Sequence, residues 1–135
     1  MSISGGIPTL KMPTAKGWIG DHKPTAAPGL KVNAFARDLK HPRWIYVLPN
    51  NDVLVAEALG LPWDKAKTPF EYAMFSTMKR AKAVGESSNR ISIFRDADGD
   101  GVGEVHDIFL ENLYHPFGMT LLDGTFYVGN TDGIV

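Results

Sequence analysis

The residues best suited to chemistry lie in one stretch, RDADGDGVGEVHD, which runs from Arg95 to Asp107. Three aspartates stand at alternate positions in it, and a glycine and a glutamate follow them. A hard cation such as Ca²⁺ takes about six to eight oxygen ligands, and alternate carboxylates in a tight loop direct their oxygens to one point. The spacing therefore predicts a calcium site. Its expected ligands are the side chains of Asp96, Asp98, Asp100 and Glu104 and the backbone carbonyl of Val102.

The same stretch does not fit an EF-hand. An EF-hand needs a helix on each side and a bidentate glutamate at the last loop position, where this chain has Asp107 between strand-like patterns. The alternative is a charged hairpin turn whose carboxylates are solvated. Aspartates this close repel one another unless a cation or a basic group is near, which favours a bound ion. We expect that ion to stiffen the turn and to take no part in catalysis.

Two histidines form a second candidate set, because Leu-x-His-Pro occurs twice, from Leu39 and again from Leu113. A strand pattern, a short turn and a second strand pattern follow each copy. His41 and His115 therefore hold equivalent positions at the entry to a strand, where they either face a ligand or cap the strand as polar packing groups. Arg43, two residues further on, is either a ligand-binding group or a surface ion-pair partner.

The elements that must position these residues are mostly strands. Short runs rich in Val, Ile and aromatic residues, bounded by turn residues, predict buried strands. Alternation in LKVNAF predicts one more, half-buried strand. A tight hairpin is expected over Asp123 and Gly124, because DG favours that turn. The expected strands cover residues 30–35, 43–48, 53–58, 90–95, 104–110, 117–122 and 125–130.

One helix interrupts the strands. Thr68 and Glu71 form a capping box, and Pro69 occupies the favoured first helical position. Apolar residues then recur every three or four positions, so one face is expected to pack against the domain. The pattern predicts a helix from about 69 to 83, ended by Gly85.

Composition excludes several classes of function. Apolar content is 44%, the net charge is −1 and no basic run appears, so nucleic acid is not an expected partner. The absence of cysteine excludes disulfides, zinc fingers and iron–sulfur clusters. We expect a soluble chain without a transmembrane segment, cytoplasmic as written and periplasmic if a signal peptide precedes it. Residues 1–29, rich in proline and glycine, are expected to form an extended leader.

The repeat defines a fold class. Without the helix, the unit has four strands and about 45–50 residues, which is typical of β-propeller blades. Residues 30–135 would then be an incomplete all-β propeller, since closure typically takes about four to eight blades. The final TDGIV has the pattern of another strand beginning, which favours the N-terminal part of a longer protein. The alternative, a truncated product, would need a sandwich fold or self-association to cover its strand edges.

Two blocks, GLKVNAFARDLKHPRWIYVLPNNDVLVAEA and NRISIFRDADGDGVGEVHDIFLENLYHPFGMTLLDGTFYVGNTDGIV, resemble the N-terminal portion of the sorbosone dehydrogenase family. The resemblance covers residues 29–135, and PTAKGWIGDHKP is similar to the family's leader. That family is related to soluble glucose and aldose dehydrogenases that use pyrroloquinoline quinone. The resemblance implies a six-bladed propeller, of which this chain would hold about the first two blades and one inserted α-helix.

The resemblance also implies a reaction, the oxidation of a sugar or sugar aldehyde by hydride transfer to the quinone. In such enzymes a histidine removes the substrate proton, and basic groups hold the cofactor's carboxylates, mostly in later blades. By position, His115 is the expected base, and His41 and Arg43 are expected near the cofactor. An electron acceptor would serve the full-length enzyme. The alternative is a non-catalytic propeller module that binds a carbohydrate or a protein.

Overall fold

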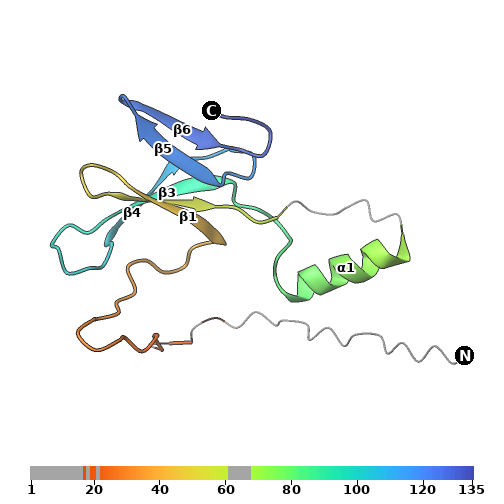
Figure 1. Ribbon diagram of the computed structural model, residues 1–135, viewed down its shortest axis with the longest axis horizontal. Coiled ribbons are helices and arrows are strands. Elements are labelled where there is room, and N and C mark those ends of the chain that lie inside the picture. Colours follow the sequence, from red (N-terminus) through yellow and green to blue (C-terminus); the bar gives the residue numbers. More distant parts are fainter. Residues whose placement is uncertain (1–16, 18, 21, 61–67) are drawn as a thin grey trace, which may run out of the picture.

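A four-stranded antiparallel sheet forms the centre of the protein (Figure 1). The computed structural model describes residues 17, 19, 20, 22–60 and 68–135. The strands pair in chain order, each with the next, so the sheet is a simple meander. The prediction of a mostly β protein is confirmed, although no closed sheet is seen among the described residues. The strands are β1 (Pro42–Val47), β2 (Val53–Glu57), β3 (Arg90–Arg95) and β4 (Val105–Leu110).

A separate hairpin follows the sheet. Strands β5 (Gly118–Leu122) and β6 (Thr125–Gly129) are antiparallel and joined by the expected two-residue turn. Asp123 (φ 48°) and Gly124 (φ 79°) are both left-handed, which is the conformation of a type I′ turn. This turn matches the right-handed twist of the strands and fixes their register.

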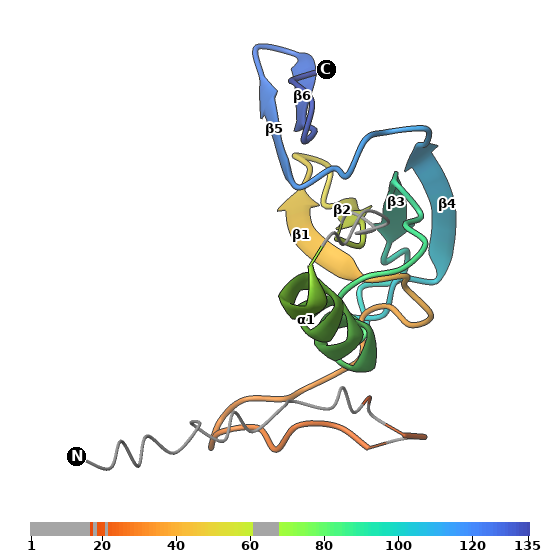
Figure 2. The same cartoon turned by 90° about the vertical axis from the view of Figure 1, so that its right-hand side faces the viewer.

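The core lies between one face of the sheet and the hairpin, which lies above the sheet in Figures 1 and 2. Leu54 and Ile91 of the sheet are fully buried, and Met119 and Val128 of the hairpin belong to the same cluster. The Tyr46 hydroxyl accepts a hydrogen bond from the Leu121 N–H (3.2 Å), which ties the sheet to the hairpin. The hairpin therefore packs on the sheet as a second layer.

Helix α1 (Pro69–Arg80) begins where the capping box predicted. The Glu71 N–H donates to Thr68 Oγ1 (3.2 Å), and the Thr68 N–H donates to Glu71 Oε2 (2.9 Å). The expectation of a packed apolar face is only partly met, because no helical residue is buried and Phe70 is 75% exposed. Within the part of the chain that the structure describes, no helix is long and apolar enough to cross a membrane.

The end of α1 differs from the prediction. Lys82 adopts a left-handed conformation (φ 54°), and the Ala83 N–H donates to the Met78 carbonyl (2.9 Å). This is a Schellman arrangement, and it ends the helix before residue 83 and ahead of Gly85. Lysine rather than glycine therefore takes the left-handed position.

The strand expected at residues 30–35 is absent, which corrects the prediction. Leu30 is 71% exposed, although its alternation with polar residues predicted burial. A strand needs a continuous series of backbone hydrogen bonds to a neighbouring strand. This segment meets the sheet region through one backbone hydrogen bond, from the Gly103 N–H to the Phe35 carbonyl (2.8 Å). The leader expected over residues 1–29 lies largely outside the described residues, and 22–29 contain no helix or strand.

The backbone reproduces the sequence repeat. His41 (φ 57°) and His115 (φ 49°) are both left-handed, and so are Asp38 and Asn112, three residues before each (φ 60° in both). Left-handed residues other than glycine are uncommon, so their recurrence at equivalent positions indicates one shared local structure. Both Leu-x-His-Pro segments therefore share two left-handed backbone positions ahead of a strand.

The last residues also follow the pattern of the first unit. Gly129 forms an antiparallel bridge with Ile134, and the N–H groups of Val128 and Val135 donate to each other's carbonyls (2.7 and 3.0 Å). Residues 134 and 135 thus pair with β6 in the register in which β3 pairs with β2. In TDGIV, where the sequence predicts the beginning of a strand, the structure has this isolated bridge and no further named strand.

Candidate functional site

The candidate residues lie at two opposite ends of the sheet. Pro42 pairs with Glu57, and Glu57 pairs with Arg90, so the start of β1, the end of β2 and the start of β3 share one end. We call it the histidine end, because the first Leu-x-His-Pro segment enters β1 there and the second contacts the β2–β3 connection. The acidic loop, residues 96–104, joins β3 to β4 at the other end. The predicted metal ligands and the predicted histidines therefore form two separate sites.

A buried carboxylate organises the histidine end. Glu57 is 0% exposed and accepts hydrogen bonds from Arg90 Nε (2.9 Å), from Ser92 Oγ (2.5 Å) and from the Lys40 N–H. The Lys40 bond holds the residue before His41, so one side chain links the strand entry to β3. A buried charge is tolerated only when it is paired and hydrogen-bonded, as here.

The hydrogen bonds decide the ionisation of Glu57. Burial disfavours the charged form and raises the pKa, but the bonds from Arg90, Ser92 and Lys40 outweigh that effect. The net pKa of Glu57 lies below its ordinary value, and the carboxylate is ionised near neutral pH. The negative charge is therefore a permanent structural feature of this end.

His115 is the buried histidine of the repeat. It is 9% exposed, and its Nδ1 lies 2.6 Å from the carbonyl oxygen of Leu59. A carbonyl can only accept, so Nδ1 must carry the hydrogen, and Nε2 of the neutral ring carries the lone pair. The Tyr114 ring stands edge-on to the imidazole with centroids 5.1 Å apart. The ring is thus held in one orientation with its Nε2 basic.

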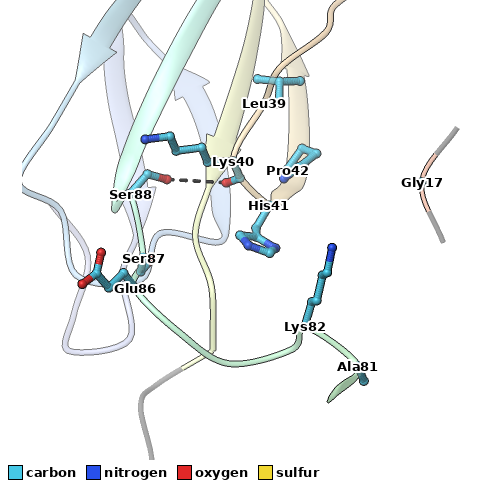
Figure 3. Close-up of a pocket in the computed structure, with 10 residues that line it drawn as sticks. All are labelled: Gly17, Leu39, Lys40, His41, Pro42, Ala81, Lys82, Glu86, Ser87 and Ser88. Carbon is cyan, nitrogen blue, oxygen red and sulfur yellow. Dashed lines mark hydrogen bonds between the residues drawn. The ribbon is translucent and has the colours of Figure 1, made fainter. Parts of the chain in front are cut away.

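His41 occupies a different environment from His115. It is exposed and lines an open hollow of about 910 Å³ between the entry to β1 and the end of α1 (Figure 3). Figure 3 shows the His41 imidazole and the Lys82 side chain directed toward the middle of this hollow. Ser88 Oγ donates its shorter hydrogen bond to the Glu57 carbonyl (3.0 Å), and the Lys40 carbonyl lies 3.5 Å from the same hydroxyl (Figure 3). The lining also includes the cationic side chain of Lys40 and the carboxylate of Glu86.

Arg43 lies beside an aromatic pair. Its guanidinium carbon is 5.4 Å from the centre of the Phe117 ring, which also contacts the Trp44 ring with centroids 5.6 Å apart. This is cation–π geometry, and it joins the first strand entry to the second. Among the described residues Arg43 forms no ion pair.

The acidic loop brings its four carboxylates together. Ligand oxygens of Asp96, Asp98, Asp100 and Glu104 all lie within 4.8 Å of one another. Asp96 Oδ1 accepts from the Gly99 N–H (2.7 Å), and Asp96 Oδ2 accepts from the Gly101 N–H (2.9 Å). Both glycines are left-handed, which allows the chain to wrap around Asp96. The loop is a folded concave turn.

Repulsion among these carboxylates affects the pKa of Asp98. The Asp100 N–H lowers the pKa of Asp98, but the charge of Asp100, with burial and the charges of Glu104 and Asp96, outweighs it. The net pKa of Asp98 is raised above its ordinary value. A divalent cation between these groups would remove the repulsion.

The nearest arginine does not neutralise the loop. Arg95 binds Asp52 with two bonds, Nε to Oδ1 and an outer guanidinium nitrogen to Oδ2, both 2.6 Å. These bonds lower the pKa of Asp52 and raise that of Arg95. Within the described ranges no lysine or arginine forms an ion pair with a carboxylate of the acidic loop.

Sequence reasoning missed Asn89, although it is central to the histidine end. Its Oδ1 accepts from Ser87 Oγ (2.6 Å) and from the His115 N–H (3.3 Å). The available signal was an Asn directly before a strand, where Asn tolerates a left-handed backbone, and its φ is 49°.

Asn130 corresponds to Glu57 in the second unit, and the two differ. Asn130 Oδ1 is buried and has no hydrogen-bond partner among the described residues. The residues that stand where the donors Arg90 and Ser92 stand in the first unit are Gly133 and Val135, which carry no side-chain donor. Glu57 thus joins strands of its own unit by hydrogen bonds, and Asn130 Oδ1 makes no such bond among the described residues.

Comparison of the chain with protein-family models, with curated proteins and with solved structures found no match.

Proposed function

We propose that this chain is the N-terminal part of a quinone-dependent sugar or sugar-aldehyde dehydrogenase, built from the first two blades of a β-propeller. The repeated strand entries support the architecture, because the two units share two left-handed positions and the same strand order. The face-to-face contact of the hairpin with the sheet is the way in which neighbouring blades pack. A propeller would also place both histidines at strand entries near a central channel.

The observation that carries the catalytic proposal is the state of His115. Its Nδ1–H donates to the Leu59 carbonyl, which leaves Nε2 as a proton acceptor in a fixed orientation. A general base that removes a hydroxyl proton needs this arrangement. The substrate class, a sugar or sugar aldehyde, comes from the sequence resemblance alone.

The hollow at His41 is the proposed contact region for an anionic cofactor. Pyrroloquinoline quinone, which accepts the hydride when bound, carries carboxylates. The donors of His41 and Lys82, which line the hollow, suit such groups. Arg43, two residues after His41 and over the Phe117 ring, is proposed to act beside them. These residues would hold and orient the cofactor at the side of the channel formed by the first blade. The rest of its shell would come from other blades.

We also propose that the acidic loop binds calcium as a structural ion. The four convergent carboxylates lack a basic partner among the described residues, and the raised pKa of Asp98 reports their uncompensated charge. The Val102 carbonyl is the proposed fifth protein ligand, and water would complete the shell. The ion would stiffen the β3–β4 turn, at the end of the sheet opposite the histidines.

Asp98→Asn is expected to weaken calcium binding roughly tenfold or more, because it removes one charge and keeps the oxygen that accepts the Asp100 N–H (3.1 Å). Asp107→Asn is the matched control, because Asp107 lies outside the cluster. The calcium affinity of this variant should match that of the wild type. Isothermal titration with calcium measures both. Calcium at about one hundred times its Kd should add roughly 2.7 kcal/mol to the free energy of unfolding. Equal binding by both variants would contradict the site.

The proposed activity is tested with the natural protein that carries this chain, supplied with pyrroloquinoline quinone and calcium. We expect aldose- or aldehyde-dependent reduction of an artificial dye, and we expect His115→Gln to lower the rate by roughly 10²–10⁴-fold, the usual share of a general base. The non-catalytic module predicts no dye reduction together with carbohydrate or protein binding at the channel face. An unchanged rate in His115→Gln would reject the role of His115.

A further inference from the structure

We infer that Asn89 is a positioning residue that fixes the tautomer of His115. The catalytic use of this tautomer rests on the proposed function, whereas the tautomer itself and the role of Asn89 do not. The inference follows from hydrogen bonds that converge on Asn89 from both partners of the His115–Leu59 contact.

The first set of bonds holds the backbone around His115. Asn89 Oδ1 accepts from the His115 N–H (3.3 Å), and the Asn89 carbonyl accepts from the Leu113 N–H (3.0 Å). Two hydrogen bonds to Asn89 thus hold the Leu-x-His segment in place. This matters because His115 has a left-handed backbone (φ 49°), which is uncommon and must be held by its surroundings.

The second set holds the acceptor. Ser87 Oγ donates to Asn89 Oδ1 (2.6 Å) and accepts from the Leu59 N–H (2.9 Å). The Leu59 carbonyl then accepts from His115 Nδ1 (2.6 Å). Asn89 Oδ1 therefore sets the position of the imidazole through one partner and the position of its acceptor through the other. The bonds form a closed ring through Asn89, Ser87, Leu59 and His115.

This ring decides which nitrogen of His115 is basic. The tautomer of a neutral imidazole follows the hydrogen bond that one nitrogen makes, and the carbonyl of Leu59 selects Nδ1–H. Without the ring, the imidazole would lose this acceptor and the Nε2–H form would become available. Asn89 thus acts on the reactive nitrogen without touching it.

Histidine ¹⁵N NMR of this chain, at roughly pH 8 where ordinary imidazoles are neutral, measures the tautomer directly. The resonances of His115 are identified by their loss in His115→Gln. We expect Nδ1–H in the wild type. We expect Asn89→Gly to lower the ratio of Nδ1–H to Nε2–H by roughly five- to tenfold, the effect of one ordinary hydrogen bond. Glycine keeps the left-handed backbone of position 89 and removes only the side chain.

Three further variants make the test specific. Asn89→Asp keeps Oδ1 and should retain the wild-type tautomer, and Asn112→Gly, a change at another left-handed Asn (φ 60°), should leave it unaltered. Ser87→Ala breaks the ring at a second point and should shift the ratio in the same direction, which keeps the test valid if Asn89→Gly does not fold. An Nε2–H tautomer in the wild type, or an unchanged ratio in the variants that break the ring, would overturn the inference.

The failure of this inference and the failure of the proposed function can be told apart. The NMR measurement needs neither quinone nor substrate. A correct tautomer with no dye reduction would reject the dehydrogenase and keep the role of Asn89. Dye reduction by the wild type, with an unchanged tautomer in the variants that break the ring, would reject the role of Asn89 and keep the dehydrogenase.

Discussion

Glu57→Ala is expected to lower the free energy of unfolding by about 3–5 kcal/mol, the range found when one member of a buried ion pair is removed. The carboxylate is fully buried and takes bonds from Arg90, Ser92 and the Lys40 N–H. Alanine leaves the side-chain donors of Arg90 and Ser92 without this acceptor, and it opens a cavity beside them. A loss of this size is a large part of the stability of a small domain. Urea denaturation followed by far-UV circular dichroism measures it.

The comparison variants separate charge from shape. Glu57→Gln keeps the volume and one acceptor oxygen, so it should cost less, about 1–3 kcal/mol. Glu111→Ala, at an exposed position in the β4–β5 connection, should change the unfolding free energy by less than about 0.5 kcal/mol. A Glu57→Ala effect no larger than that of Glu111→Ala would show that the buried carboxylate does not organise this end.

The depressed pKa of Glu57 adds a pH dependence with a defined sign. A carboxyl group whose pKa is lower in the folded than in the unfolded state contributes stability above its unfolded pKa, here about 4.5. That contribution is lost as the pH falls through the lower folded value. Wild-type stability should therefore decline below about pH 4.5, and this part of the decline should vanish in Glu57→Gln.

Ile91→Ala is expected to cost about 2–5 kcal/mol, the range for truncating a buried aliphatic side chain. Ile91 is 0% exposed in β3 and lies in the cluster with Met119 and Val128 of the hairpin. The substitution therefore weakens both the sheet and its contact with the second unit. Thermal and urea unfolding should each report the loss.

A matched isoleucine provides the control for Ile91. Ile45 lies in the edge strand β1 and is 64% exposed, so Ile45→Ala should cost less than about 1 kcal/mol. Similar losses for both variants would mean that the hairpin does not share a core with the sheet. A two-step transition in Ile91→Ala, with the hairpin unfolding first, would agree with the two-unit organisation.

Local signals in the sequence predicted the elements well. The start of α1 follows from the capping box at Thr68 and Glu71, whose bonds close within four residues. The β5–β6 hairpin follows from Asp123 and Gly124, because a tight primed turn needs residues that tolerate positive φ. The cluster of carboxylates in the acidic loop also follows from spacing, since its ligand atoms come from four residues of one short loop, 96–104.

Contacts between segments that are distant in the chain could not be predicted from the sequence. The Leu59 carbonyl meets His115 across 56 positions, and Arg95 meets Asp52 across 43. No local pattern specifies which carbonyl or carboxylate such a side chain will reach. The strand expected from Leu30 failed for the related reason that alternation reports the possibility of a buried face and cannot supply a neighbouring strand. The early end of α1 depended on Lys82 adopting a left-handed backbone, which lysine seldom does.

The repeat lies between these two cases. The sequence showed that His41 and His115 correspond, and the structure gives both the same left-handed entry. Their surroundings nonetheless differ, because the second histidine is covered by the β2–β3 connection of the first unit, and His41 is exposed. In the proposed function, this exposure leaves His41 open to a ligand in the hollow that it lines together with Lys82.

The most direct test of the account is a spectrophotometric titration of the natural protein that carries this chain with pyrroloquinoline quinone, in the presence of calcium. We predict saturable binding that Lys82→Ala weakens roughly fivefold, the loss expected for one partly exposed charge contact. Lys79→Ala, in the last turn of α1 and outside the hollow, should leave the affinity unchanged. The absence of saturable quinone binding by a protein whose acidic loop still takes up calcium would contradict the proposed function.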